Sequence, residues 1–310
     1  MNTEEAIKHP NIPQTETEKE LEKQKVTKII TKIITYTFLA IMALVIIIPF
    51  YWMLITSLKS AIEVEVFPPT LFPRKLIFYN YVEALERANL LRYFFNTILV
   101  SVFSTLFGTF FSIFVAYALG RLNFKGKDIV FTVLLATMMI PGEMMVITNY
   151  ITVSNFGWVD PGQGSRVANG PYYAMIVPFL ISIFHIYLLR QTFKQVPNEL
   201  YYAAKVDGTS DWKYLWRVMV PLAKSSIITI IILKLMGAWN SYVWPNLVAS
   251  ENYRLITNGL RAAFYNSDTG RTEFQLQMAA TVMVTLPLLI VFIFFRKYIM
   301  RGVSRSGIKG

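Results

Sequence analysis

Cysteine is absent from this 310-residue chain, and histidine occurs only twice, at His9 and His185. The absence of cysteine excludes disulfide bonds and thiol chemistry, and two histidines cannot build a histidine-rich metal cluster. Charged residues are also scarce, at 16% of the chain, where a soluble domain has about a quarter. No motif assembles a nucleophile, a base and an orienting group. We therefore expect no catalytic residue, metal or cofactor.

Apolar residues are abundant instead, at 54% of the chain, with 15% aromatic residues and a mean hydropathy of +0.44. A helix needs about 20 apolar residues to cross a bilayer core. Six segments meet this requirement if the third and the fifth each tolerate one charge, and they are 33–58, 93–120, 129–159, 168–189, 225–250 and 274–295. We predict an all-α, polytopic membrane bundle of six transmembrane helices over residues 33–295.

The distribution of lysine and arginine predicts the orientation of this bundle, because these residues favour the cytoplasmic side of a membrane. They concentrate in segments 1–32, 121–128, 190–224 and 296–310. We therefore expect cytoplasmic termini, with 1–32 as a tail and lead-in helix and 296–310 as a C-terminal tail. The net charge of +11 is then a topology signal, since no basic soluble face for nucleic acid is present.

Small residues recur at every fourth position of the second span. They are Ser104, Gly108, Ser112, Ala116 and Gly120. Such positions share one helix face and let a neighbouring helix approach closely. The pattern predicts a packing face, and a second interpretation places Ser104 or Ser112 in the lining of a pathway.

The segment from Gly120 to Asp128 resembles a phosphate-binding loop only superficially. Five residues separate Gly120 from Gly126, and Asp128 stands where a magnesium-binding Ser or Thr is required. No strand precedes the segment, which joins two membrane helices. We therefore expect no ATPase activity in this chain.

A polar segment of the third cytoplasmic region, which we call the coupling segment, spans residues 197–221. Pro197 and Glu199 favour the start of a helix, and Gly208 favours a left-handed cap. The pattern predicts two short helices around a tight turn, which would be marginal alone in water. Either the segment is an ordinary interhelical loop, or its small alanines and large aromatics form a docking surface for a partner.

Spacing favours docking, because the segment resembles the E-A-A-x-x-x-G-x9-I-x-L-P loop of importer permeases. The matching residues run from Ala203 and Ala204 through Gly208 to Pro221. Further matching motifs, in the order in which they occur in those permeases, extend the resemblance over most of 33–310. They are Ala116–Arg121, Ile140–Gly142, Leu188–Gln191, Trp239–Asn240, Trp244–Pro245 and 301–310. The chain thus resembles carbohydrate-type permeases of ATP-binding-cassette importers. Departures are Tyr202 for the glutamate of the motif, Val218 and Val220 for its Ile and Leu, and Glu143 where glutamine is common.

This resemblance implies a type I importer permease fold in a bacterial plasma membrane. The implied partners are a second, related permease, two cytoplasmic ATPase subunits and an extracellular solute-binding protein. The first span would be peripheral, and the external loop 251–273, with Asn266 to Gly270, would reach into the binding protein. The residues implied to couple to the ATPase are Glu199, Tyr202, Ala203, Ala204, Asp207, Gly208 and Pro221.

Two charges inside spans are candidates for function, because such residues are costly in a bilayer. Glu143 follows a break at Pro141 in the third span, and Lys234 lies in the fifth. Counted along straight helices from the cytoplasmic edge, both lie about 20 Å deep. We hypothesise a direct pair or a shared aqueous cavity. The alternatives are snorkelling or a bundle hydrogen bond for Lys234, and an external cavity for Glu143.

Aromatic and amide side chains of the fifth span complete the predicted translocation pathway. They are Trp239, Asn240, Tyr242 and Trp244. Asn240 fits either the pathway or an interhelical hydrogen bond, and the tryptophans fit either the pathway or an interfacial belt. The favoured function is a permease for an oligosaccharide. Alternatives are a permease for glycerol phosphate or a related polyol and, from another class, an ion-coupled secondary transporter; a membrane-embedded enzyme is disfavoured.

Overall fold

The computed structural model describes residues 14–266 and 271–304, and the chain divides into two compact units. Residues 1–55 form the first unit, whose described part is most of helix α1, Gln14–Ser57. The part Lys19–Ser57 contains an apolar window and is long enough to cross a membrane. Pro49 lies inside this helix without ending it. The first predicted span is therefore present as one continuous helix.

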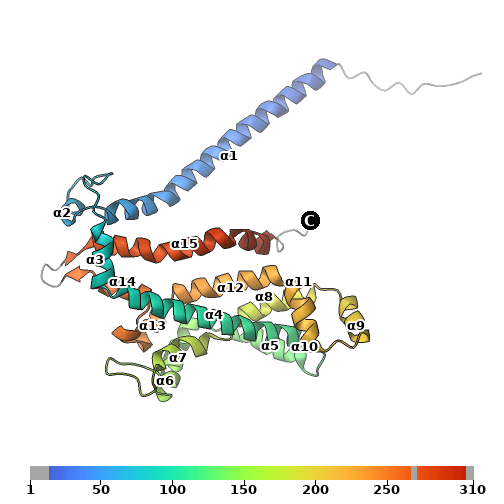
Figure 1. Ribbon diagram of the computed structural model, residues 1–310. Helices are drawn as coiled ribbons and strands as arrows, with labels where there is room; N and C mark the ends of the chain where they lie inside the picture. The colour runs from blue at the N-terminus through green and yellow to red at the C-terminus, as the bar shows by residue number, and fades with distance from the viewer. Residues whose placement is uncertain (1–13, 267–270, 305–310) are drawn as a thin grey trace, which may run out of the picture. The chain divides into compact units, whose positions relative to one another are not determined.

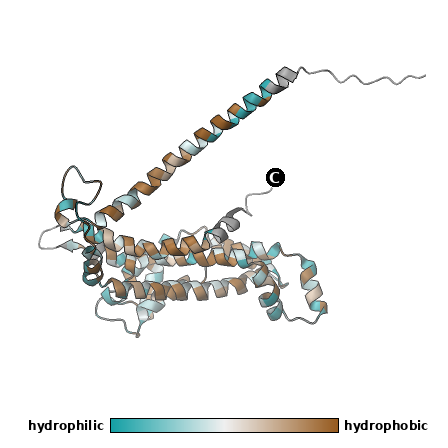
Figure 2. Cartoon of the chain, turned by 45° about the horizontal axis from the view of Figure 1, so that its top comes forward, coloured by the Kyte–Doolittle hydropathy of each residue, from teal (hydrophilic) through white to brown (hydrophobic). Residues whose placement is uncertain are grey.

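The second unit, residues 56–310, is built around helix α4, Leu90–Gly120. Helix α4 packs against α8, Ile183–Lys194, and α12, Lys224–Trp239, while α12 packs in turn against α15, Phe274–Ser304. These helices run side by side in Figure 1. In Figure 2 these helices carry mainly the brown of hydrophobic residues. Long apolar helices thus form the centre of the unit, as a membrane bundle requires.

The small residues of α4 form the packing face that their spacing predicts. A Cβ built on Gly108 would lie 2.8 Å from the Leu180 carbonyl oxygen, so this backbone is in close contact with its neighbour. Ser112 and Ala116 are fully buried. The Ser112 hydroxyl donates to the Gly108 carbonyl of its own helix at 2.6 Å. This hydrogen bond lets a polar residue sit in a helix interface.

Breaks divide two of the predicted spans, the third and the fourth, into bent pairs. The third consists of α5, Lys127–Thr137, and η1–α6, Gly142–Asn155, at 89° to each other. The fourth consists of α7–η2, Gly170–Phe179, and α8, at 42°. Helix α12 is preceded by a segment at 80°, Asp211–Leu222. In the described residues, three continuous helices and three bent pairs give up to six spans, by length and composition.

The fifth span is shorter than predicted. We predict apolar sequence to residue 250, but α12 ends at Trp239 and a separate helix, α13, covers Val243–Val248. Pro245 explains the break, because a proline removes a backbone donor and its ring clashes with the carbonyl four residues earlier. The Asn240 side chain caps the end by donating to the Met236 carbonyl at 2.8 Å.

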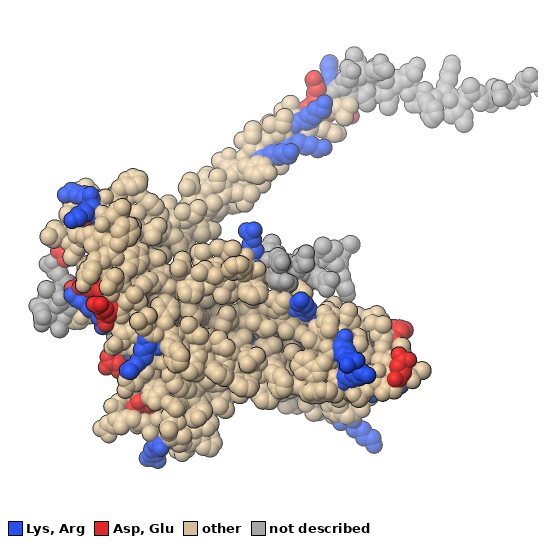
Figure 3. Space-filling model, viewed as in Figure 1, with Lys and Arg blue, Asp and Glu red and all other residues tan. Residues whose placement is uncertain are grey.

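Short elements gather at the two ends of the second unit (Figure 1). One end carries α2 (Ala61–Val64), α3 (Tyr79–Arg87), η4 (Glu251–Tyr253), α14 (Ile256–Ala262) and the antiparallel pair β1 (Tyr265–Asn266) and β2 (Arg271–Thr272). The other carries α9 (Asn198–Val206), α10 (Asp211–Tyr214), η3 (Leu215–Met219) and α11 (Val220–Leu222). Figure 3 shows charged side chains mostly toward these ends and few between them. Charge thus avoids the stretch that would lie in lipid.

Candidate functional site

The coupling segment folds as the two short helices that its sequence predicts. Pro197 is the N-cap residue of α9. The first helical residue is therefore Asn198, whereas we expected Pro197 in that position. Gly208 has φ +70°, the left-handed conformation that favours glycine, and its amide donates to the Lys205 carbonyl at 3.0 Å. Ser210 caps α10 by accepting from the Lys213 amide at 3.3 Å. The turn between the helices is therefore fixed by both caps.

A single carboxylate oxygen joins the two helices. Asp211 Oδ1 accepts from the hydroxyl of Tyr201 at 2.9 Å and from that of Tyr117, on α4, at 3.3 Å. Lys205 Nζ lies 3.0 Å from the same oxygen. This bond to Asp211 raises the pKa of Lys205 above its ordinary value. The arrangement connects α9, α10 and the end of α4, so that the segment has a fixed shape.

The two faces of α9 differ in their surroundings. On the inner face, Tyr201 and Ala204 pack against the buried core around Phe193 and Tyr214. On the outer face, Val206 is 89% exposed and Tyr202 is 62% exposed. The other exposed coupling candidates are Glu199, Ala203, Asp207, Gly208 and Pro221. The exposed part of the segment thus combines small and apolar groups with the acids Glu199 and Asp207, and Ala204 is the predicted residue that turns inward.

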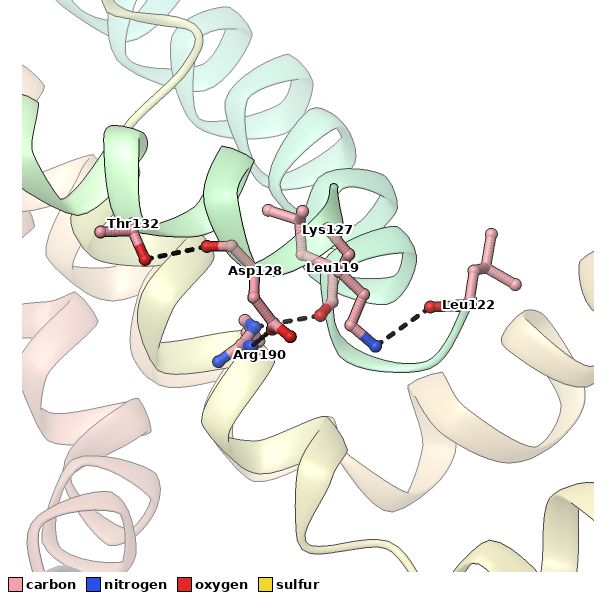
Figure 4. Close-up of polar contacts among 6 residues, drawn as sticks. All are labelled: Leu119, Leu122, Lys127, Asp128, Thr132 and Arg190. Atoms are coloured by element: carbon pink, nitrogen blue, oxygen red, sulfur yellow. Dashed lines mark hydrogen bonds and ion pairs between the residues drawn. The ribbon is translucent and has the colours of Figure 1, made fainter. Parts of the chain in front are cut away.

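A second set of polar contacts holds the loop between α4 and α5 (Figure 4). The Nε of buried Arg190, on α8, donates to the Leu119 carbonyl at 3.0 Å, and its guanidinium lies 3.6 Å from Asp128 Oδ1. The central carbon of the Arg190 guanidinium, Cζ, lies 3.6 Å from the centre of the Phe131 ring. Lys127 Nζ donates to the Leu122 carbonyl at 3.1 Å. The loop that resembled a phosphate site is therefore engaged in internal contacts.

The coupling segment is tied to this loop by Arg121. Its guanidinium donates to the Asn198 side chain at 2.5 Å and also to the Val196 carbonyl. Sequence reasoning did not single out the anchoring roles of Arg190, Asp128 or Asp211. For Arg190 and Asp128 the available signal was a charged residue directly beside a predicted span, whereas Asp211 lies within the polar coupling segment and carried no such signal.

A cavity of about 310 Å³ lies between α4, the broken fourth span and α12–α13. Two of the predicted pathway residues, Lys234 and Trp244, line it. Ser104 lines it too, as the second interpretation of the α4 stripe anticipated. Sequence reasoning missed the remaining polar lining residues, which are Ser182, His185 and Ser241.

Lys234 contacts backbone at the break of the fourth span. Its ammonium donates to the carbonyls of Phe179 and Leu180, each at 3.3 Å. Glu143 is exposed, and among the residues described here no ion pair joins it to Lys234. The hypothesis of a direct pair is therefore corrected, because equal depths were counted along straight helices and the third span bends by 89° before Glu143.

The pathway candidates Trp239, Asn240 and Tyr242 are not among the residues that line the cavity. Trp239 is buried and packs edge-on against Phe94, with ring centres 6.3 Å apart. Asn240 is exposed and donates to the Met236 carbonyl of its own helix at 2.8 Å. The carbonyl of Tyr242 accepts from the Asn258 side chain at 2.9 Å. Their assignment to the pathway stays a prediction.

The opposite end of the unit has a fixed loop between α6 and α7. Buried Asp160 accepts from the amides of Gly162 and Gly164, each at 2.9 Å, and from the Ser250 hydroxyl at 2.5 Å. Burial alone would raise the pKa of the Asp160 carboxyl, but these hydrogen bonds outweigh it and hold that pKa below its usual value. Of the loop 251–273, which the sequence predicts to be external, residues 267–270 lie outside the described residues.

These features match a known family. Residues 108–305 match the binding-protein-dependent transport system inner membrane component, which covers more than half of the chain. The chain belongs to this family of importer permeases. The predicted resemblance and the multi-pass membrane location are therefore confirmed.

Characterised and named relatives share most of their length with this chain. The melibiose/raffinose/stachyose import permease protein of Bacillus subtilis is 31% identical over 271 residues, covering 87% of this chain and 94% of the relative. An inner membrane ABC transporter permease of Escherichia coli is 30% identical, covering 89% and 95%. The diacetylchitobiose uptake system permease of Streptomyces coelicolor is 28% identical, covering 88% and 87%.

The fold also matches that of a solved importer. A chain in the crystal structure of a bacterial ABC transporter that imports the acidic polysaccharide alginate gives a TM-score of 0.77 at 24% identity. The match covers 88% of this chain and 97% of the other. The predicted all-helical importer permease fold is confirmed, apart from the two-residue strands β1 and β2.

Proposed function

We propose that this chain is a permease subunit of an ATP-driven oligosaccharide importer and forms half of its translocation pathway. Family membership supports the transport role. The names of relatives from Bacillus subtilis and Streptomyces coelicolor support the substrate class, because they refer to the import or uptake of oligosaccharides. In this role the chain carries out no chemistry, and ATP is hydrolysed by separate subunits.

The observation that carries the proposal is the outer face of α9. Apolar side chains exposed to water are unfavourable, and a group of them commonly marks an interaction site. Val206 and Tyr202 are largely exposed, whereas Ala203 leaves room for a partner to approach the backbone. The three donors to Asp211 hold this face in one shape. A helix in a groove is a recurring mode of recognition.

Rigid attachment is what coupling requires. If an ATPase groove holds α9 and the groove moves as nucleotide-bound ATPases close, the motion passes to the bundle through packed elements. Tyr201 and Tyr214 connect α9 to the core that contains α4 and α8. Arg121 adds a polar connection from α4 to the start of α9. A loosely attached loop would absorb the movement instead of transmitting it.

The remaining partners follow from the same proposal. A second, related permease would complete the pathway, because the cavity of about 310 Å³ in this chain is at the low end of ligand pockets. Two ATPases would bind at the α9 end, in the cytoplasm together with both termini. An extracellular binding protein would dock at the opposite end, which carries the fixed Asp160 loop and the 251–273 region.

The experiment is a bulk insertion on the outer face of α9. Ala203→Trp adds an indole at an exposed position, so the bundle should fold normally. We expect the ATPase subunits to be lost on purification and ATP-dependent oligosaccharide uptake into proteoliposomes to fall at least about tenfold, or about 1.4 kcal/mol. Ala61→Trp, at an exposed alanine at the other end, is the matched control and should retain the ATPases. Normal copurification and uptake with Ala203→Trp would contradict the proposal.

A further inference from the structure

The cavity beside Lys234 has an unusual charge balance. Its described lining includes one lysine and one histidine but no aspartate or glutamate. Within the described residues, no carboxylate forms an ion pair with Lys234. A cation inside a membrane span is costly unless it is paired. The fold of this chain alone therefore does not explain why a charged residue stands at position 234.

Hydrogen bonding to the broken fourth span does not supply that reason. The carbonyls of Phe179 and Leu180 are freed where the helix breaks, and Lys234 donates to both at 3.3 Å. Neutral donors such as a glutamine amide can satisfy carbonyls equally well. An ammonium group has three donors, so the hydrogen bonds to these two carbonyls leave one donor for a ligand, and Lys234 lines the cavity. The position and charge of Lys234 fit an anion in that space.

Other groups around the cavity suit the rest of a sugar. Ser182 and Ser241 contribute hydroxyls, and Trp244 contributes an aromatic wall. The indole of Trp244 is held in place, because its Nε1 donates to the Ala174 carbonyl at 3.0 Å. The Nδ1 of His185 is buried and makes no hydrogen bond among the described residues. A buried polar atom without a partner commonly marks a place for a ligand or water.

We propose that this cavity takes an acidic sugar ring, with Lys234 as the counterion of its carboxylate. The inference rests on the proposed function and narrows its substrate class from oligosaccharides in general to those that contain uronic acids. Lys234 would bind the carboxylate in an apolar surrounding, where charge-assisted hydrogen bonds are stronger than in water. The hydroxyls and Trp244 would contact the ring and contribute little to the choice between acid and neutral sugars.

The test compares acidic sugars with uncharged sugars in the complete importer. The complex of both permeases, the ATPases and the binding protein is reconstituted in proteoliposomes that contain ATP. The probes are trigalacturonate, its methyl ester, maltotriose and raffinose. We expect uptake of trigalacturonate at least about tenfold faster than uptake of its ester, a difference that one charge-assisted hydrogen bond can supply. This comparison needs no variant, so it stands even if a substitution disturbs folding.

A substitution then assigns the preference to Lys234. Lys234→Gln retains donors for the two carbonyls but removes the charge, and it should abolish the preference for the acid over the ester. Lys224→Gln, ten residues earlier on the exposed start of α12, is the matched control and should retain it. Uptake of trigalacturonate that Lys234→Gln leaves unchanged would overturn the inference. Import of the neutral sugars alone would overturn it while leaving the proposed function intact, and import of none would contradict both.

Discussion

The hydroxyl of Tyr201 donates to Asp211 Oδ1 at 2.9 Å and thereby joins the two helices of the coupling segment. Tyr201 precedes the turn at Gly208 and Asp211 follows it, so this side-chain hydrogen bond bridges the turn. Lys205 reaches the same oxygen at 3.0 Å. The outer face of α9 thus depends on groups that lie behind it, and these can be altered without touching the surface that a partner would contact.

Removing the Tyr201 hydroxyl should loosen α9. Hydrogen bonds to charged groups contribute about 1.5–3 kcal/mol, and Tyr201→Phe removes one of the three donors to Asp211. We expect faster amide hydrogen exchange in α9 by about tenfold and reduced ATP-dependent uptake. Tyr202→Phe is the matched control, because Tyr202 is largely exposed and adjacent in sequence. Equal exchange rates in the two variants would contradict the role assigned to the Tyr201 bond.

Gly108 and Gly120 should respond oppositely to the same substitution. A Cβ on Gly108 would overlap Lys234 Nζ and lie 2.8 Å from the Leu180 oxygen, whereas a Cβ on Gly120 meets its nearest neighbour, Phe193 Cβ, at 3.5 Å. Overpacking costs about 1–3 kcal/mol, and alanine in place of a helical glycine gains about 0.5–1 kcal/mol when there is room. Thermal inactivation of the purified complex measures both effects. Equal loss of stability in Gly108→Ala and Gly120→Ala would contradict the packing described for α4.

Asp160 should stabilise the α6–α7 loop in a pH-dependent way. Because its folded-state pKa is lowered from 3.8, its contribution is present above that value and is lost as the pH falls through the lower, folded-state pKa. Asp160→Ala leaves two amides and one hydroxyl without an acceptor, at about 1–3 kcal/mol each if they stay buried. Asp160→Asn should cost less, since its amide oxygen can still accept from Gly162 and Gly164. Hydrogen exchange of these two amides, measured above and below the transition, checks the prediction, and protection that does not change with pH would refute it.

How far the sequence predicts the structure can be judged from particular residues. The fourfold spacing from Ser104 to Gly120 predicted a packing face, because helix geometry places such residues on one side whatever the neighbour is. The turn at Gly208 was predictable for the same local reason, since few other residues adopt its backbone conformation. Features set by neighbours in sequence were thus accessible before the structure.

Features set by distant segments were not accessible. Lys234 bonds to carbonyls freed at a break 54 positions earlier, and the sequence around Pro178 did not reveal where that break would fall in space. Asp211 belongs to the coupling segment, yet it accepts from Tyr117, 94 positions away on another helix. The depth estimate for Glu143 assumed a straight helix, whereas the third span bends by 89° before this residue. Each of these features depends on where the backbone places distant segments relative to one another, which the local sequence does not reveal.

The orientation can be tested because the chain has no cysteine to interfere with labelling. Single cysteines are introduced at Gln163, on the exposed α6–α7 loop, and at Val206, on α9. A membrane-impermeant maleimide should label Gln163→Cys in intact cells and Val206→Cys only after permeabilisation. The reverse pattern would invert the proposed topology and place α9 away from any cytoplasmic ATPase.

Cross-linking from the outer face of α9 tests coupling most directly. A benzophenone maleimide is attached to Val206→Cys in the reconstituted importer, the sample is irradiated, and the adducts are identified by mass spectrometry. We predict a cross-link to the ATPase subunit, with a yield that changes on addition of ATP, and no such adduct from Gln163→Cys. Adducts of Val206→Cys with lipid or with the permease alone would contradict the assignment of α9 as the element that docks on the ATPase.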